Sequence, residues 1–287
     1  MTQLRIIHAR VAPASLKEMS SDNRAYRPCL LCAGHSGVEH YCQFGAHEYV
    51  RCGGCGLVYV DKLPTPAEMM GAYTGGGFRS LRRRLMAPFR KLRHHTGYAQ
   101  SMERARQIFA FAHAALGQKH NAGLRFLDIG CNKGFLLCAA LAHGADVYGI
   151  ELVREIMIPF GNTYPRYRDH IYSEKLAAVA DRIETGFFDL ISAIDVVEHF
   201  EDPVSDMKHV HRMLKDGGVA VLQTPDAGCA RAKQERCRWG ALKPLEHLHL
   251  FDRANFVPFA GRVGFRDVRI LDPFEEADGN FVAVLRK

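Results

Sequence analysis

The stretch RFLDIGCNKGFLL at residues 125–137 combines an acid with a glycine turn, a combination that could bind a nucleotide-like ligand. Asp128 comes first, and Gly130 and Gly134 follow it. A phosphate-binding Walker loop needs Gly-Lys-Ser/Thr, whereas Lys133 here precedes the last glycine and no hydroxyl follows. Because a carboxylate repels a pyrophosphate and attracts a cation, the predicted ligand is a positively charged nucleoside without phosphate, S-adenosylmethionine.

Four cysteines near the N-terminus have the spacing of a tetrahedral metal site. Cys29 and Cys32 form one Cys-x-x-Cys pair, and Cys52 and Cys55 form another after a stretch suited to a hairpin. Four buried thiols are the alternative. Since four thiolates fill the coordination sphere, we predict a structural zinc ribbon over residues 29–60. Other potential ligands in this stretch are interpreted as bystanders: Cys42, His35, His40 and His47.

Two histidine clusters could do acid–base chemistry. One is Glu198-His199, and the other is Glu246-His247-x-His249. The methyl group of a sulfonium is already activated, so the protein must align the acceptor and often remove its proton. A neutral imidazole suits that task near neutral pH, and a neighbouring carboxylate raises its basicity. As alternatives, His199 supports a helix, and His249 is structural.

Strands and helices alternate regularly from residue 124 onward, which predicts an α/β fold with a mostly parallel sheet covered by helices on both faces. A helix is predicted over 203–218, directly before the fifth strand. The last two strands follow each other without a helix, so we expect the final one to be antiparallel. The seven strands are expected at 124–130, 146–152, 170–173, within 188–200, and at 219–225, 266–272 and 280–287.

Together these motifs resemble the class I S-adenosylmethionine-dependent methyltransferases over about residues 121–287. LDIGCNKG resembles their cofactor loop, VYGIE ends in the acid that takes both ribose hydroxyls, and IDVVEHFEDP and MLKDGGVAVLQTPD resemble strands of small-molecule and ubiquinone-type O-methyltransferases. Asn132 stands where many members have glycine, and asparagine tolerates the left-handed backbone. The resemblance implies a Rossmann-like seven-stranded sheet and these cofactor-binding residues: Asp128, Gly130, Asn132, Gly134, Glu151, Tyr172, Ser173 and Asp195.

The sequences EHLHLF and EH resemble zinc-ribbon-bearing methyltransferases of sugar and natural-product pathways. The resemblance implies that their His and Glu remove a proton from the substrate, with a tyrosine ahead of the core. Relatives that methylate sugar carbon carry a further C-terminal domain, so carbon methylation is not expected. Trp239 and Arg238 are candidates for the substrate entrance, although a lone tryptophan is as often core. The candidate catalytic residues are His199, His247, Glu246 and Tyr73.

The 287 residues divide into four predicted parts: an N-terminal extension (1–28), the zinc ribbon (29–60), a helical linker or lid (61–120) and the methyltransferase domain (121–287). No long apolar run or apolar leader occurs, so the chain is expected to be cytoplasmic. In that compartment, nine cysteines argue against disulfides and for metal binding or burial.

A basic amphipathic segment from Arg79 to Arg93 admits three interpretations: a solvated helix face, contact with an anionic membrane, or contact with RNA phosphates. The net charge of +7 suits anionic partners. We expect methyl transfer to O or N of a small molecule, sugar, glycolipid or natural-product intermediate. The alternatives are an RNA methyltransferase, whose usual Asn/Asp-Pro-Pro-aromatic string is missing here, and a non-catalytic binding protein. The sequence does not indicate an oligomeric state.

Overall fold

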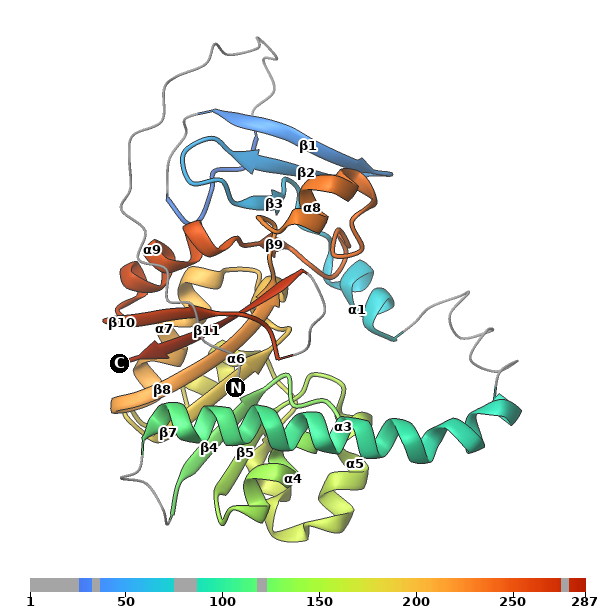
Figure 1. The fold of residues 1–287 in the computed structure, drawn as a ribbon, viewed down its shortest axis with the longest axis vertical. Helices are drawn as coiled ribbons and strands as arrows, with labels where there is room; N and C mark the ends of the chain where they lie inside the picture. Colours follow the sequence, from blue (N-terminus) through green and yellow to red (C-terminus); the bar gives the residue numbers. More distant parts are fainter. Residues whose placement is uncertain (1–25, 33–36, 75–86, 118–122, 275–278) are drawn as a thin grey trace.

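The computed structural model describes residues 26–32, 37–74, 87–117, 123–274 and 279–287, without the side chains of 73–74 and 87–97. A seven-stranded sheet in the order β10-β11-β8-β7-β4-β5-β6 forms the larger body (Figure 1). β11 runs antiparallel to both of its neighbours, whereas the other pairs are parallel, as predicted. The strands are β4 (Arg125–Ile129), β5 (Asp146–Ile150), β6 (Ile171–Tyr172), β7 (Phe188–Ile194), β8 (Leu214–Pro225), β10 (Asp267–Leu271) and β11 (Asn280–Arg286).

Helices bury both faces of this sheet, which explains the nearly continuous apolar runs of its strands. Successive side chains of β4 point to opposite faces: Phe126 joins one core cluster and Leu127 the other. The first cluster receives side chains from α3 (Ala87–Leu116), α4 (Phe135–Ala142) and α5 (Arg154–Thr163). The second receives them from α6 (Leu176–Ala180), α7 (Pro203–Met213) and α9 (Arg253–Val263).

α3 is a helix of 30 residues. It begins at Ala87, so Pro88 stands in its first turn, where proline costs no helical hydrogen bond. Farther along, Phe109 is fully buried and packs edge-on against Phe126 of β4, with ring centroids 5.4 Å apart. This helix, assigned to the linker from the sequence, therefore packs onto the sheet. The basic residues from Arg79 to Arg84 lie outside the described residues.

The predicted helix over residues 203–218 is too long. α7 ends at Met213, and β8 begins at Leu214, which pairs with Phe188 of β7. Leu214 is fully buried, and Gly217 adopts a left-handed backbone (φ 77°) that would break a helix. Burial of Leu214 in the sheet therefore outweighs the helical pattern of the preceding residues.

The N-terminal module contains β1 (Val38–Phe44), β2 (His47–Cys52) and β3 (Val58–Val60) in an antiparallel sheet. β1 and β2 form the hairpin expected between the two cysteine pairs. A fourth strand, β9 (His249–Leu250), comes from far along the chain and pairs with β3. The first helix, α1 (Pro66–Thr74), follows the module. The ribbon thus shares a sheet with the segment that contains the second histidine cluster (Figure 1).

The prediction that the cysteines form no disulfide is wrong for one pair. Cys42 of β1 and Cys237 of η3 (Arg236–Arg238) are disulfide-bonded, with a Cα–Cα distance of 5.5 Å. The two residues are 195 positions apart, so only the docking of η3 against β1 brings them together. The bond fixes the ribbon to the insertion after β8, which includes α8 (Ala230–Glu235).

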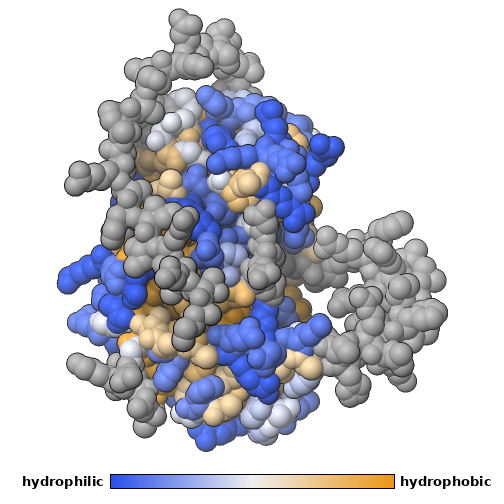
Figure 2. Space-filling model, in the orientation of Figure 1, coloured by the Kyte–Doolittle hydropathy of each residue, from blue (hydrophilic) through white to orange (hydrophobic). Residues whose placement is uncertain are grey.

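The surface facing the viewer in Figure 2 is mainly hydrophilic over the outer part of the ribbon, and apolar residues gather over the sheet body. Within the described part of the chain, no helix combines the length and apolarity that a membrane span requires. Some large apolar side chains of the described residues are exposed, which is ordinary for a protein surface. They are Met70, Tyr98, Leu152, Ile158 and Val257.

Candidate active site

The glycine turn lies at the carboxyl end of β4, where a parallel α/β sheet binds its ligands. Gly130 and Gly134 both have left-handed backbones, with φ of 72° and 75°. A Cβ on Gly130 would lie 2.5 Å from Val196, and one on Gly134 would lie 2.7 Å from Phe160. Both positions therefore require glycine for conformation and for space.

Asn132 adopts the left-handed conformation (φ 47°), as expected of an asparagine in a glycine position. Its backbone N–H donates to a carboxylate oxygen of Glu151 at 3.0 Å. The other oxygen of Glu151 accepts from the N–H of Val153 at 2.9 Å. The half-buried Glu151, just beyond β5, thus joins two neighbouring loops and could accept hydrogen bonds from ribose hydroxyls.

Asp128 lies beneath the turn as a buried carboxyl group. It accepts a hydrogen bond from the Ser192 hydroxyl at 2.6 Å, from β7. Burial and, to a smaller extent, the charge of Glu151 raise the pKa of Asp128 to about 7. A positively charged ligand would oppose both effects, so the pair of acids suits a cation.

Two further cofactor candidates lie at the edge strand β6. Tyr172 and Ser173 are half-buried, and the carbonyl of Tyr172 accepts from the N–H of Glu151 at 2.9 Å. Arg182 covers the Tyr172 ring at 5.3 Å from its centroid. These residues therefore lie beside Glu151, where the resemblance expects adenine.

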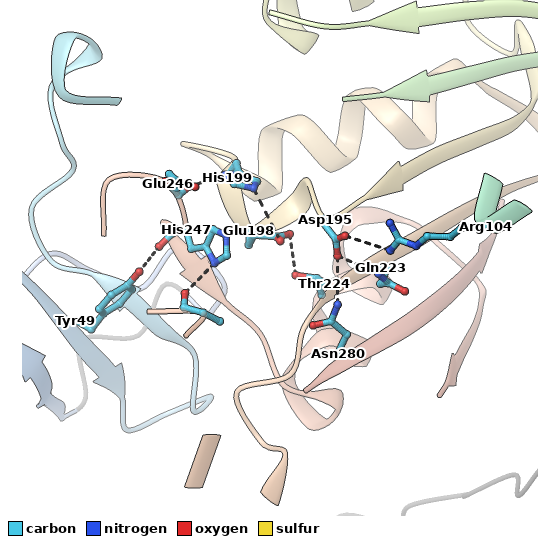
Figure 3. Close-up of polar contacts among 11 residues, drawn as sticks. Tyr49, Arg104, Asp195, Glu198, His199, Gln223, Thr224, Glu246, His247 and Asn280 are labelled. Atoms are coloured by element: carbon cyan, nitrogen blue, oxygen red, sulfur yellow. Dashed lines mark hydrogen bonds and ion pairs between the residues drawn. The ribbon is translucent and has the colours of Figure 1, made fainter. Parts of the chain in front are cut away.

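Asp195 follows β7 and has an unusual left-handed backbone, with φ of 57°. Its carboxylate accepts from Gln223 at 3.0 Å and from Asn280 at 3.3 Å, and it forms an ion pair with Arg104 of α3 at 3.6 Å (Figure 3). These contacts from β8, β11 and α3 hold the carboxylate at the wall of a pocket. Sequence reasoning did not identify Arg104, Gln223 or Asn280, because they come from three distant elements.

The pocket has a volume of about 360 Å³ and lies between the end of the sheet and the insertion after β8. Its size suits a small acceptor or one ring of a larger molecule. Trp239 lies in its wall, although the ring is 5% exposed and also belongs to the ribbon core. The exposed Arg238 is not among the lining residues, which are Asp195, Glu198, Pro225, Arg231, Trp239, Gly240, Ala241, Lys243, His247, Gly279 and Asn280.

The two histidine clusters meet at this pocket. The rings of His199 and His247 pack edge-on with centroids 4.8 Å apart, beside the fully buried carboxyl of Glu198 (Figure 3). Nδ1 of His199 lies 2.7 Å from the carbonyl of Glu246, and Nδ1 of His247 lies 2.8 Å from that of Ala241. Because a carbonyl only accepts, each Nδ1 carries the proton and each Nε2 presents a lone pair.

Burial sets the protonation of this Glu198–His199–His247 cluster. It lowers the pKa of His199, and it lowers the pKa of His247 to about 3, so both rings are neutral. Burial and, to a smaller extent, the charge of nearby Asp195 raise the pKa of Glu198 to about 8. Thr224 donates a hydrogen bond to Glu198 at 3.0 Å. The cluster therefore offers two imidazole lone pairs and one carboxyl group.

The structure also gives the positions of the remaining residues that the sequence analysis considered for proton transfer. The carbonyl of Glu246 accepts from His199, and the acid of the predicted Glu198-His199 cluster also lies beside the histidine rings. Tyr73 lies in α1, but its side chain lies outside the part that the structure describes. His249 is fully buried between the Phe200 carbonyl and Arg27, as expected for a structural residue.

The four predicted metal ligands come together in the ribbon. The sulfur atoms of Cys29, Cys32, Cys52 and Cys55 all lie within 4.8 Å of one another. Two of the contacts, Cys29–Cys55 and Cys32–Cys52, are 3.5 Å. This arrangement could hold one tetrahedral zinc ion.

The chain belongs to the methyltransferase domain family, whose model matches residues 98–270. Its relatives include the ubiquinone biosynthesis O-methyltransferases of Psychrobacter arcticus (36% identical over 36% of this chain and 41% of the relative) and Leptothrix cholodnii (33% identical over 36% and 44%). The chain thus spans less than half the length of these curated relatives. Among solved structures, it is similar to the 1,6-didemethyltoxoflavin-N1-methyltransferase of Burkholderia thailandensis (17% identical, 87% of this chain, 99% of that chain, TM-score 0.49).

Proposed function

We propose that this protein transfers the methyl group of S-adenosylmethionine to an oxygen of a small molecule. The observation that carries the proposal is that a cofactor-binding turn and a pocket for an acceptor lie at the same end of the sheet. The turn between Asp128 and Glu151 suits the cofactor, and β7, β8 and the insertion form a polar pocket nearby. The names of the ubiquinone O-methyltransferase relatives support an oxygen acceptor. Nitrogen remains the second candidate atom, since the family match does not distinguish the two.

The cofactor is held in this proposal by charge and by hydrogen bonds. Glu151 accepts from the ribose hydroxyls, Tyr172 and Ser173 border adenine, and Asp128 favours the positively charged end. Gly130 and Gly134 let the backbone approach the ligand closely. Asp195 lies between cofactor and acceptor, since it follows β7 and lines the pocket.

The acceptor is a polar small molecule, such as a sugar, a phenol or a natural-product intermediate with a free hydroxyl. Its pocket contains carboxylate, amide and ammonium groups beside the Trp239 ring, which together suit hydroxyl-bearing compounds. The Glu198–His199–His247 cluster draws the proton from the acceptor hydroxyl. The ribbon holds a structural zinc ion and supports this wall, and the cytoplasm is the proposed compartment.

The proposed site is tested with His199→Ala and His247→Ala beside Asp128→Ala. We expect Asp128→Ala to abolish cofactor binding measured by calorimetry. The histidine variants should keep cofactor affinity and lose about 10²–10⁴-fold in turnover, the usual contribution of a proton-transfer group. Exposed His40→Ala, in β1, is the matched control and should retain full turnover. Normal turnover in both histidine variants would contradict this part of the proposal.

The acceptor class is tested with methyl-labelled S-adenosylmethionine, the purified protein and fractionated cell extract. We expect label in the small polar solutes or in lipid. Label in RNA would overturn the small-molecule proposal and would make the Arg79–Arg93 segment a candidate phosphate contact. Label in no fraction, together with tight cofactor binding, would favour a non-catalytic role.

A further inference from the structure

The Glu198–His199–His247 cluster has the composition of a divalent metal site, and its possible ligand atoms lie close together. One oxygen of Glu198 and one nitrogen from each histidine all lie within 4.8 Å of one another. Two imidazoles and one carboxylate are a common ligand set for zinc and for other first-row transition metals. We propose that this cluster, separate from the ribbon cysteines, binds one such cation and presents it to the acceptor pocket.

The contacts around the ligands already have the form that metal-bound histidines need. The Nδ1–H groups of His199 and His247 donate to the carbonyls of Glu246 and Ala241, so the lone pair of each ring is on Nε2. This arrangement fixes the ring orientation and raises the basicity of the ligand nitrogen. The Thr224 hydroxyl donates a hydrogen bond to one oxygen of Glu198, which also fixes the position of this carboxyl group.

The backbone segments that carry the ligands are also fixed to each other. The N–H of Leu248 donates to the carbonyl of Glu198 at 2.7 Å, which ties the two histidine segments together. The hydroxyl of Tyr49, from ribbon strand β2, donates to the carbonyl of His247 at 2.6 Å (Figure 3). A rigid support of this kind keeps three side chains from different segments within reach of one ion.

A bound cation would stabilise the buried carboxyl group of Glu198 in its ionised form. Glu198 is fully buried, and its second oxygen lies 4.0 Å from Nε2 of His199, too far for a hydrogen bond. Buried carboxylates are costly unless they are paired or bind a metal.

The cation would activate the acceptor hydroxyl for methyl transfer. This role of the cation rests on the proposed function. Three protein ligands leave a position open for an acceptor hydroxyl. With a cation bound, both imidazoles would be its ligands rather than proton acceptors, and a hydroxyl held at the open position would lose its proton to water more readily, because the cation would stabilise the oxygen anion. The oxygen lone pair then forms a bond to the methyl carbon, while the methyl–sulfur bond breaks and leaves a neutral thioether.

The test is elemental analysis of the full chain, supplied with Zn²⁺ and then freed of loosely bound ion by gel filtration. Glu198→Gln and His247→Ala should each hold about one ion per chain fewer than the wild type. Glu201→Gln is the matched control: this residue lies three positions from Glu198 and pairs with Lys175 at the surface. Its metal content should equal that of the wild type. Calorimetric binding of S-adenosylmethionine checks that each variant is folded.

The outcomes separate this inference from the proposed function. If the folded Glu198→Gln and His247→Ala proteins hold as much metal as the wild type, the metal site is wrong, whatever their activity. If they lose the ion but the wild type methylates no extract fraction, the metal site stands and the proposed function fails. Loss of the ion and of methyl transfer together, with cofactor affinity unchanged, supports both.

Discussion

At the scale of single residues, the cofactor turn combines a steric requirement with an electrostatic one. Gly130 and Gly134 have no room for a side chain, whereas Asp128 is buried at a cost that a cationic ligand would offset. The turn is therefore best suited to its ligand when Asp128 is ionised, which makes cofactor binding depend on pH.

We expect S-adenosylmethionine to bind about tenfold more tightly at pH 8 than at pH 6, because the pKa of Asp128 in the free protein is about 7. Below that pKa the carboxyl group is protonated and must lose a proton before it attracts the sulfonium. Above it the affinity should level off. Isothermal calorimetry measures the profile, and Asp128→Asn should bind weakly without this dependence. An equally steep profile in Asp128→Asn would assign the effect to another group.

At the scale of elements, the ribbon sheet supports the histidine segment through the buried hydroxyl of Tyr49. Tyr49→Phe removes its hydrogen bond to the His247 carbonyl. We expect a loss of about 1 kcal/mol in the free energy of unfolding and a several-fold fall in turnover, since His247 is less well held. Denaturant unfolding and steady-state kinetics measure the two effects.

Tyr59→Phe is the matched control for that change. Tyr59 lies in the neighbouring strand β3, and its hydroxyl donates to the Arg27 carbonyl at 2.6 Å, away from the pocket. The variant should lose a similar amount of stability and keep its turnover. Equal losses of turnover in both variants would mean that stability, and not the position of His247, explains the effect.

The disulfide between Cys42 and Cys237 joins the ribbon to the insertion that carries Trp239. Cys237→Ser should lower the free energy of unfolding by about 2–4 kcal/mol, because the bond restricts the unfolded chain. A reducing agent should have the same effect on the wild type and little further effect on the variant. Cys138→Ser, at a free thiol in α4, is the control. Denaturant midpoints that do not respond to the reductant would contradict the prediction.

At the scale of the whole molecule, the two ends of the active site depend on different modules. The cofactor turn rests on β4, β5 and β7, whereas the His247 segment rests on the ribbon through β9 and Tyr49. We therefore expect the acceptor wall, but not the cofactor site, to depend on the zinc ion proposed for the ribbon.

Loss of that zinc ion should reduce methyl transfer while it leaves cofactor binding nearly unchanged. In Cys55→Ser, which removes one proposed zinc ligand, we expect S-adenosylmethionine affinity to stay within about threefold of the wild type. Methyl transfer should fall at least about tenfold, because the pocket wall loses its support. Zinc content, calorimetry and turnover measure these effects. Equal losses of binding and turnover would show instead that the ribbon supports the whole fold.

The sequence determined the features that depend on local patterns. Alternating apolar segments predicted the seven-stranded sheet, and its lack of a last crossover helix predicted the antiparallel β11. The Cys-x-x-Cys pairs predicted a cluster that does assemble, and the glycine turn predicted the left-handed Asn132. Spacing along the chain is sufficient for such features, because their residues are close neighbours or lie at the ends of adjacent strands.

Tertiary structure decided which distant groups meet. Only folding brings His247 beside Glu198 and His199 at one pocket and joins Cys42 to Cys237. It also adds β9 to the ribbon sheet and ends α7 at Met213, against the local helical pattern. These outcomes depend on burial and packing between segments far apart in the chain, for which the sequence has no local signal.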